Sequence, residues 1–213
     1  TISRLAAATL DGRKIEGDIK PLNNFLLVKK AEVVDKTDSG IFLTGKAKIV
    51  KTEGTVVAVG PGRTHLDSGK IFEMPVEIGD GVVYGKYDGT EIDLNGEKHA
   101  LIRDDDILIK FKGELSLDTV EVVRDYVLVQ TDLKEVETEG GILIAKSSKT
   151  ERKPSTGTVV KVGRGKMAAN GELMAMEVDI GDMVKYRDFA GNEVEIDDVE
   201  YSVVKMSDIL AKF

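Results

Sequence analysis

Short runs of bulky apolar residues, separated by turn residues, recur along this chain and predict β-strands. Val56-Val57-Ala58-Val59 is entered through Gly-Thr and left through a glycine-rich corner, and Val159-Val160-Lys161-Val162 is flanked in the same way. β-Branched runs of this kind favour strands, and Asn170-Gly171 favours a tight hairpin. Helix is expected only in short pieces near Asp106 and Asp208. The pattern predicts an all-β protein made of small antiparallel barrels or sandwiches.

The pattern occurs twice in the sequence. Phe25-Leu26-Leu27-Val28 matches Tyr126-Val127-Leu128-Val129 at an offset of 101 residues, and Ile78-Gly79-Asp80 matches Ile180-Gly181-Asp182 at an offset of 102. Small changes of offset confined to polar segments are typical of a duplicated domain. We therefore predict two barrels in tandem. The predicted tail, first barrel, linker and second barrel are residues 1–18, 19–111, 112–118 and 119–213.

The tail does not resemble the repeats. Leu5-Ala6-Ala7-Ala8 favours helix, and Arg4, Arg13 and Lys14 add positive charge. We interpret this segment either as the remnant of a processed targeting region or as a frayed terminus.

Each repeat also carries an apolar tripeptide inside a long polar segment. Ile41-Phe42-Leu43 follows Ser39-Gly40, and Ile142-Leu143-Ile144 follows Gly140-Gly141 at an offset of 101 residues. One such run alone would favour a short buried strand. Two at matched positions, each followed by a polar stretch with little to bury, indicate a flexible loop that presents an apolar plug to a partner. The candidate binding residues are Gly40, Ile41, Phe42, Leu43, Thr44, Gly141, Ile142, Leu143 and Ile144.

Composition argues against several kinds of chemistry. The chain has no cysteine and only two histidines, His65 and His99, which argues against thiolate zinc sites, cysteine nucleophiles and histidine-based triads. A net charge of −8 argues against a nucleic-acid partner, and no apolar run approaches the ~20 residues of a membrane-spanning helix. We interpret Asp104-Asp105-Asp106 as a solvated turn and His65 as an exposed turn residue. Partners are expected to be proteins.

The order and spacing of these motifs resemble a GroES-type co-chaperonin of the chaperonin-10 family, found twice. The resemblance is carried by Ile19-Lys20-Pro21-Leu22, Phe25-Leu26-Leu27-Val28, Gly40-Ile41-Phe42-Leu43, Gly54-Thr55-Val56-Val57-Ala58-Val59-Gly60, Gly79-Asp80 and Asp106-Ile107-Leu108, with their counterparts in the second half. Two such units in one chain are similar to the double-barrel co-chaperonin of plastids. The resemblance implies two tandem GroES-like barrels, each with a mobile loop and a roof hairpin, at residues 64–72 and 167–173.

The resemblance also implies a function. The two tripeptides would dock on a hydrophobic groove of a large GroEL-type chaperonin ring, which itself binds and hydrolyses ATP. This chain would then be a lid without cofactor, metal or catalysis that encloses unfolded client proteins. Several weakly binding loops on one ring gain affinity by acting together. Phe42 is bulkier than the residue usual in the family, and Pro154 lies in the longer second loop, so the two loops are expected to differ in affinity.

The implied assembly is a ring in which the last strand of one barrel pairs with the first strand of the next, both across the linker and between chains. Chains with two barrels give even totals, whereas the chaperonin ring of this family is sevenfold. Four copies, or a mixed ring with single-domain co-chaperonins, both fit. Asn24 stands where the family has an acidic residue, which Asp125 retains. The implied location is the plastid stroma, with the mitochondrial matrix or the bacterial cytoplasm as alternatives.

Two other classes of protein fit the sequence less well. Zinc-dependent alcohol dehydrogenases contain a GroES-like barrel, but their zinc relies on cysteine and histidine, and no Gly-x-Gly-x-x-Gly follows a strand here. An enzyme is therefore not expected. The remaining alternative is a two-barrel protein-binding adaptor without a chaperonin partner, which would bury Ile41-Phe42-Leu43.

Overall fold

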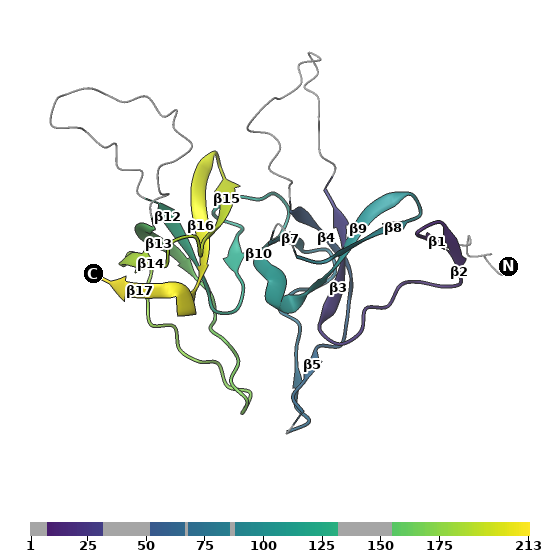
Figure 1. Cartoon of the computed structure of the whole chain (residues 1–213), viewed down its shortest axis with the longest axis horizontal. Helices are drawn as coiled ribbons and strands as arrows, with labels where there is room; N and C mark the ends of the chain where they lie inside the picture. The colour runs from purple at the N-terminus through teal and green to yellow at the C-terminus, as the bar shows by residue number, and fades with distance from the viewer. Residues whose placement is uncertain (1–7, 32–51, 67, 86–87, 132–154) are drawn as a thin grey trace, which may run out of the picture. The chain divides into compact units, whose positions relative to one another are not determined.

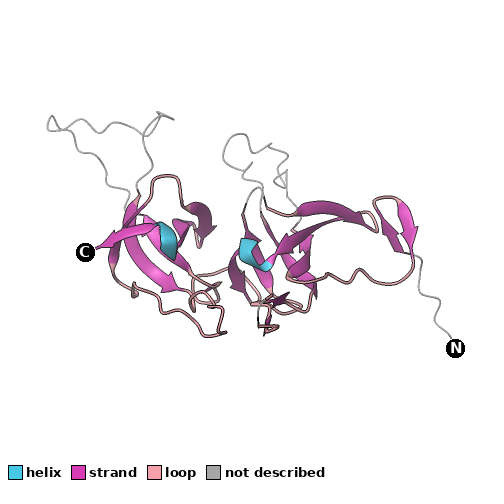
Figure 2. Ribbon diagram, turned by 60° about the horizontal axis from the view of Figure 1, so that its bottom comes forward, coloured by secondary structure: helices cyan, strands magenta, loops and turns pink. Residues whose placement is uncertain are grey.

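The computed structural model describes residues 8–31, 52–66, 68–85, 88–131 and 155–213 (Figure 1). This part of the chain consists of β-strands and loops with two short 3-10 helices, η1 (Asp104–Asp106) and η2 (Met206–Asp208) (Figure 2). The all-β prediction is confirmed, and both short helices lie where the sequence indicated. Neither helix in the described part has the length and apolar character needed to cross a membrane.

The first of two compact units comprises Thr1–Val123 with Met167–Leu173 and contains a nine-stranded antiparallel sheet. Across the sheet the strands are β11 (Glu121–Val122), β10 (Ile107–Phe111), β7 (Gly81–Tyr84), β4 (Glu53–Val59), β3 (Phe25–Lys30), β9 (Glu97–Arg103), β8 (Thr90–Leu94), β1 (Ala8–Leu10) and β2 (Arg13–Ile15). A separate hairpin is formed by β5 (Arg63–Thr64) and β6 (Ile71–Phe72).

The second unit comprises Arg124–Lys166 with Met174–Phe213 and contains a six-stranded antiparallel sheet. Its strands, in sheet order, are β17 (Ile209–Lys212), β14 (Met183–Tyr186), β13 (Thr156–Val162), β12 (Tyr126–Thr131), β16 (Val199–Lys205) and β15 (Asn192–Ile196). This order reproduces β10-β7-β4-β3-β9-β8 of the first unit. Even the β-bulges match, because the register shifts between Leu27 and Val28 and again between Leu128 and Val129. The tandem repeat is therefore confirmed by the strand order.

Each unit has its own hydrophobic core, and the two cores use matching positions. The first core contains Leu26, Val28, Val56, Val76, Val82, Tyr84, Ala100, Ile102, Ile107 and Val123. The second core contains Val127, Val129, Val159, Val178, Val184, Tyr186 and Val204. Every member of the second core has a counterpart in the first at an offset of 101 to 103 residues. Burial of apolar surface is the main favourable term in folding, so both repeats bury the same face of each strand.

The first unit also contains residues from beyond the predicted linker. β11 pairs with β10, with Val122 opposite Ile109, and the Val123 N–H donates to the Leu108 carbonyl at 3.3 Å. Val123 is a buried member of the first core. The expected pairing of the last strand of the first repeat with the start of the second is therefore present within this unit. The predicted boundary at residue 119 stays a prediction.

Residues 8–15 form a hairpin that was not predicted from the sequence. Its turn is Asp11-Gly12, and both residues have positive φ (48° and 77°), as this dipeptide favours in tight hairpins. The hairpin extends the sheet beyond β8, and the Asp11 N–H donates to the Asp93 carbonyl at 2.8 Å. The helix expected from Leu5-Ala6-Ala7-Ala8 is therefore wrong at Ala8, which is the one described residue of this run and lies in β1. Alanine is the best helix former, but helix propensity is a weak preference, and pairing with a neighbouring strand outweighs it at Ala8.

Candidate functional site

The residues expected to contact a partner lie outside the described part of the structure. Gly40, Ile41, Phe42, Leu43 and Thr44 belong to residues 32–51, and Gly141, Ile142, Leu143 and Ile144 belong to residues 132–154. Their roles therefore stay predictions. The structure does describe the strand ends from which both segments start and to which both return.

The two segments start and end at equivalent places in the two sheets. Residues 32–51 connect β3 to β4, and residues 132–154 connect β12 to β13, which are neighbouring strands in both units. At the first site the Ala31 N–H donates to the Glu53 carbonyl at 2.9 Å. At the second site Thr131 lies opposite Gly157. Each segment therefore begins and ends on adjacent strands of a packed sheet, the usual support of a binding loop.

A glycine is required next to each of these sites. A Cβ built on Gly54 would lie 2.3 Å from the Lys29 carbonyl oxygen, and one built on Gly157 would lie 2.2 Å from the Gln130 carbonyl oxygen. No real Cβ is tolerated at such distances from backbone, so any other residue would push the paired strands apart. The two glycines match at an offset of 103 residues, which shows that both repeats use the same close approach.

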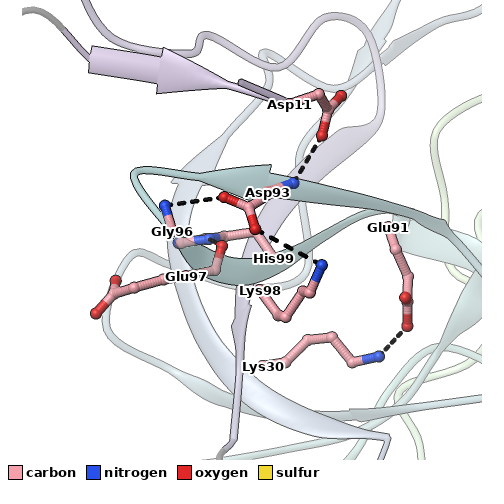
Figure 3. Close-up of polar contacts among 8 residues, drawn as sticks. All are labelled: Asp11, Lys30, Glu91, Asp93, Gly96, Glu97, Lys98 and His99. Carbon is pink, nitrogen blue, oxygen red and sulfur yellow. Dashed lines mark hydrogen bonds and ion pairs between the residues drawn. The ribbon is translucent and has the colours of Figure 1, made fainter. Parts of the chain in front are cut away.

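Ion pairs hold the end of β3, where the first segment starts. Lys29 Nζ lies 2.7 Å from Glu97 Oε1. Lys30 pairs with Glu91 on β8, as Figure 3 shows. Hydrogen bonds from the two lysines lower the pKa of Glu97 and of Glu91. A lowered carboxyl pKa stabilises the fold above the unfolded-state pKa, and this contribution is lost as the pH falls through the folded-state pKa. These pairs are exposed, so each contributes little, and Gln130 replaces Lys29 in the second repeat.

A different group of side chains holds the end of the second segment. Ser155 is buried directly before β13, and its hydroxyl donates to Asp188 Oδ1 at 2.5 Å while accepting a hydrogen bond from Lys185 Nζ. Lys185 Nζ lies 3.2 Å from the same Asp188 oxygen. The Tyr186 N–H donates to the Ser155 carbonyl at 2.9 Å. Side chains of β14 and of the turn after it thus meet at the residue where the segment rejoins its sheet.

The role of these supporting side chains was not predicted from the sequence. Ser155, Lys185 and Asp188 belong to no motif, and their positions are brought together only by the pairing of β13 with β14. The only sequence feature that points to them is a difference between the repeats, because none of the three residue types recurs at the matching position in the first half.

Both predicted roof hairpins are present. The first is β5–β6, and the second is closed by a bridge between Met167 and Leu173. His65 lies in the turn of the first hairpin and is half-buried, where an exposed residue was predicted. Its Nδ1 lies 2.9 Å from Ser68 Oγ, and its ring centroid lies 6.0 Å from that of Phe72. The described residues contain no group of three carboxylates or histidines that could hold a metal ion.

The prediction of a solvated turn is wrong for Asp104, which is completely buried. Its Oδ1 accepts a hydrogen bond from Asn24 Nδ2 at 2.5 Å, and its N–H donates to the Asn24 carbonyl at 3.0 Å. Arg63 Nη2 lies 4.0 Å from the same Oδ1. A buried carboxylate requires such donors, because an unpaired buried charge is strongly destabilising. Asn24 supplies such a donor, whereas an ionised acidic residue at this position would face the Asp104 carboxylate without one.

In the second repeat the carboxylate stands on the other side of the contact and has no amide side chain opposite it. Asp125 stands at the position of Asn24, and Met206 stands at the position of Asp104. The Met206 N–H donates to the Asp125 carbonyl at 2.8 Å, so the backbone contact is kept. Each repeat thus places only one carboxylate at this contact, which avoids repulsion between like charges.

Replacing Asn24 by aspartate is expected to destabilise the first unit by about 1–3 kcal/mol at pH 7, because the donor to the buried Asp104 becomes a second carboxylate. Urea unfolding at several pH values measures this. The loss should shrink as the pH falls, since protonating one carboxyl group restores a donor. The matched control is Asp125→Asn, which introduces no such repulsion. Equal stability of Asn24→Asp and the wild type at pH 7 would contradict the role given to this contact.

The chain matches known proteins over both repeats. The family model described as Chaperonin 10 Kd subunit matches residues 18–111 and again residues 119–213. The chain is 39% identical over 197 residues to the "20 kDa chaperonin, chloroplastic" of Spinacia oleracea, covering 91% of this chain and 74% of that protein. The protein of the same name from Arabidopsis thaliana is 36% identical over 194 residues, covering 91% of this chain and 75% of that protein.

A single-domain relative matches one repeat. The "Co-chaperonin GroES" of Clostridium botulinum (strain Eklund 17B / Type B) is 54% identical over 90 residues, which cover 42% of this chain and 94% of that protein. The duplicated strand order and these matches define a tandem co-chaperonin of the GroES type. The chain belongs to the Chaperonin 10 Kd subunit family.

Proposed function

We propose that this chain caps a large ATP-dependent chaperonin ring and encloses unfolded client proteins in its cavity. Ile41-Phe42-Leu43 and Ile142-Leu143-Ile144 are the groups that dock on the apolar groove of that ring. The observation that carries the proposal is that both tripeptide segments start and end at the same pair of strands in two repeated GroES-type units. ATP is bound and hydrolysed by the partner, and this chain senses it only through the state of the groove.

The physics of docking supports this role. A loop that orders on contact loses conformational entropy, so each contact is weak and readily reversed. Several loops on one ring bind together, and linked sites raise the affinity by roughly 10²–10⁴. Weak single contacts with strong collective binding allow timed release of the lid.

The start of the first repeat and the last strand of the second expose residues whose counterparts are buried where the repeats join. Leu22 is 71% exposed, whereas Val123, at the matching position, is 3% exposed. Leu210 on the last strand is 58% exposed, whereas the matching Leu108 is 3% exposed. Within the described residues β17 pairs with β14 alone, whereas β10 pairs with both β7 and β11. In the part of the chain that the structure describes, one edge of β17 is therefore uncovered.

These ends join different chains into a ring. The residues around Leu22 of one chain pair with β17 of the next, as β11 pairs with β10 within one chain. Such head-to-tail contacts form a closed ring when a full turn is a whole multiple of the rotation between neighbours. Four chains, or a mixed ring with single-domain co-chaperonins, meet this condition. By analogy with the chloroplastic relatives, the ring acts in the plastid stroma.

Co-sedimentation with a large double-ring chaperonin tests the proposal. The chain should pellet with the chaperonin in the presence of ATP or ADP and stay in the supernatant without nucleotide. If it stays in the supernatant under every condition, although circular dichroism shows folded sheets, the proposal is wrong. A two-barrel adaptor would then be the better account.

A further inference from the structure

A cluster of three side chains fastens the second docking segment at the point where it rejoins the sheet. A serine hydroxyl offers one donor and two acceptor lone pairs, whereas a lysine offers donors only. Lys185 must therefore donate to the Ser155 oxygen, and the hydroxyl proton points to Asp188. The charges at the two ends polarise both hydrogen bonds in the same direction, which strengthens them.

The first repeat keeps the backbone part of this arrangement. The Tyr84 N–H donates to the Thr52 carbonyl at 2.9 Å, as the Tyr186 N–H donates to the Ser155 carbonyl. Thr52 is thus the matched residue at the end of the first segment, and it retains a hydroxyl. The backbone contact is common to both repeats and cannot distinguish the two segments.

Among the described residues, the side-chain part is present in the second repeat, and the first repeat has side chains of a different chemical type at two of the three positions. Val83 stands at the position of Lys185, and Lys86 stands at the position of Asp188. With valine in place of the lysine and lysine in place of the aspartate, the two hydrogen bonds from a cation to a hydroxyl and from that hydroxyl to an anion cannot form. The two segments therefore share the backbone hydrogen bond where they rejoin their sheets, and only the sequence of the second repeat can form this group of three side chains.

We propose that Ser155, Lys185 and Asp188 are positioning residues that fix the end of the second docking segment, so that it dissociates from the chaperonin more slowly than the first. This inference rests on the proposed function. A segment loses conformational entropy when it docks, and a residue that is already fixed does not lose it again. The conformational entropy of about one residue, if it is lost before docking, corresponds to a roughly tenfold gain in affinity, and such gains appear mostly as slower dissociation.

The test isolates each segment in the full chain. The first segment is silenced by Leu43→Asp. In this background, the chain with Ser155→Ala and the chain with the wild-type Ser155 are compared by their rates of dissociation from a nucleotide-bound chaperonin ring. With Ile144→Asp silencing the second segment, Thr52→Ala is the matched control. Ser155→Thr keeps the hydroxyl and should restore slow dissociation.

The expected result is about tenfold faster dissociation for Ser155→Ala, no change for Thr52→Ala, and rescue by threonine. Hydrogen exchange of the Tyr186 amide should accelerate in parallel, while that of Tyr84 should not. Asp188→Ala alters an exposed turn residue and should reproduce the effect without risk to the core.

Each result decides between the two claims. If Ser155→Ala and Asp188→Ala both bind and dissociate like their parent, the positioning role is wrong and the proposed function stands. If the unmodified chain fails to bind the nucleotide-loaded ring, the proposed function and this inference are both overturned.

Discussion

Replacing Leu43 and Ile144 together by aspartate is expected to abolish nucleotide-dependent binding to the chaperonin ring while both sheets stay folded. Each substitution would place a charge in an apolar groove, where an unpaired charge is strongly destabilising. It also removes about 1.5–3 kcal/mol of apolar burial at each loop. Because the loops of one ring act together, the loss of affinity should exceed about a hundredfold. Sedimentation with the chaperonin measures the bound fraction.

The matched control for this double variant is Thr37→Asp with Thr138→Asp. These threonines lie at the same offset of 101 residues and add the same charge to the same segments outside the tripeptides. The control should still bind. Retained binding by a folded Leu43→Asp, Ile144→Asp double variant would overturn the assignment of the tripeptides.

Replacing Leu22 by glutamate is expected to convert the ring into separate chains or short open oligomers. Leu22 is exposed in the single chain and matches Val123, which is buried where the two repeats join. Placing a charge at this position between chains would cost about 1.5–3 kcal/mol of lost burial and a further desolvation cost at every chain-to-chain contact. Analytical ultracentrifugation measures the mass. Leu210→Glu, on the other side of the same contact, should act in the same way.

The control for the ring contact is Ile78→Glu. Ile78 is 68% exposed, much as Leu22 is, and lies in a turn within the first repeat rather than at its start. It should leave the mass unchanged. An unchanged mass for both Leu22→Glu and Leu210→Glu would contradict ring closure through these ends.

The sequence predicted the fold because the fold is built from local signals that occur twice. Val56 and Val159 lie in β-branched runs, and both are buried in matching cores. A duplicated pattern makes each prediction stronger, because the same turn or strand motif must recur in both repeats at nearly the same offset. The pairing of the last strand of the first repeat with residues at Val122 was expected only from the family resemblance and not from a local signal.

Features that depend on contacts between distant residues could not be predicted. Asp104 lies in a run of three acidic residues, which alone indicates a solvated turn, and its burial depends on Asn24, 80 positions earlier. The group around Ser155 depends on strand pairing in the same way. The N-terminal hairpin had a usable local signal in Asp11-Gly12, but its stability depends on the edge of β8.

Protease protection of a client trapped in the chaperonin tests the central claim most directly. An unfolded client is bound to the chaperonin ring, this chain and nucleotide are added, and the client is then exposed to protease. The proposed function predicts that the client survives only when both this chain and nucleotide are present, and that the Leu43→Asp, Ile144→Asp variant gives no protection. Complete digestion of the client under conditions in which this chain sediments with the ring would show that it binds without enclosing anything, and would contradict its role as a lid.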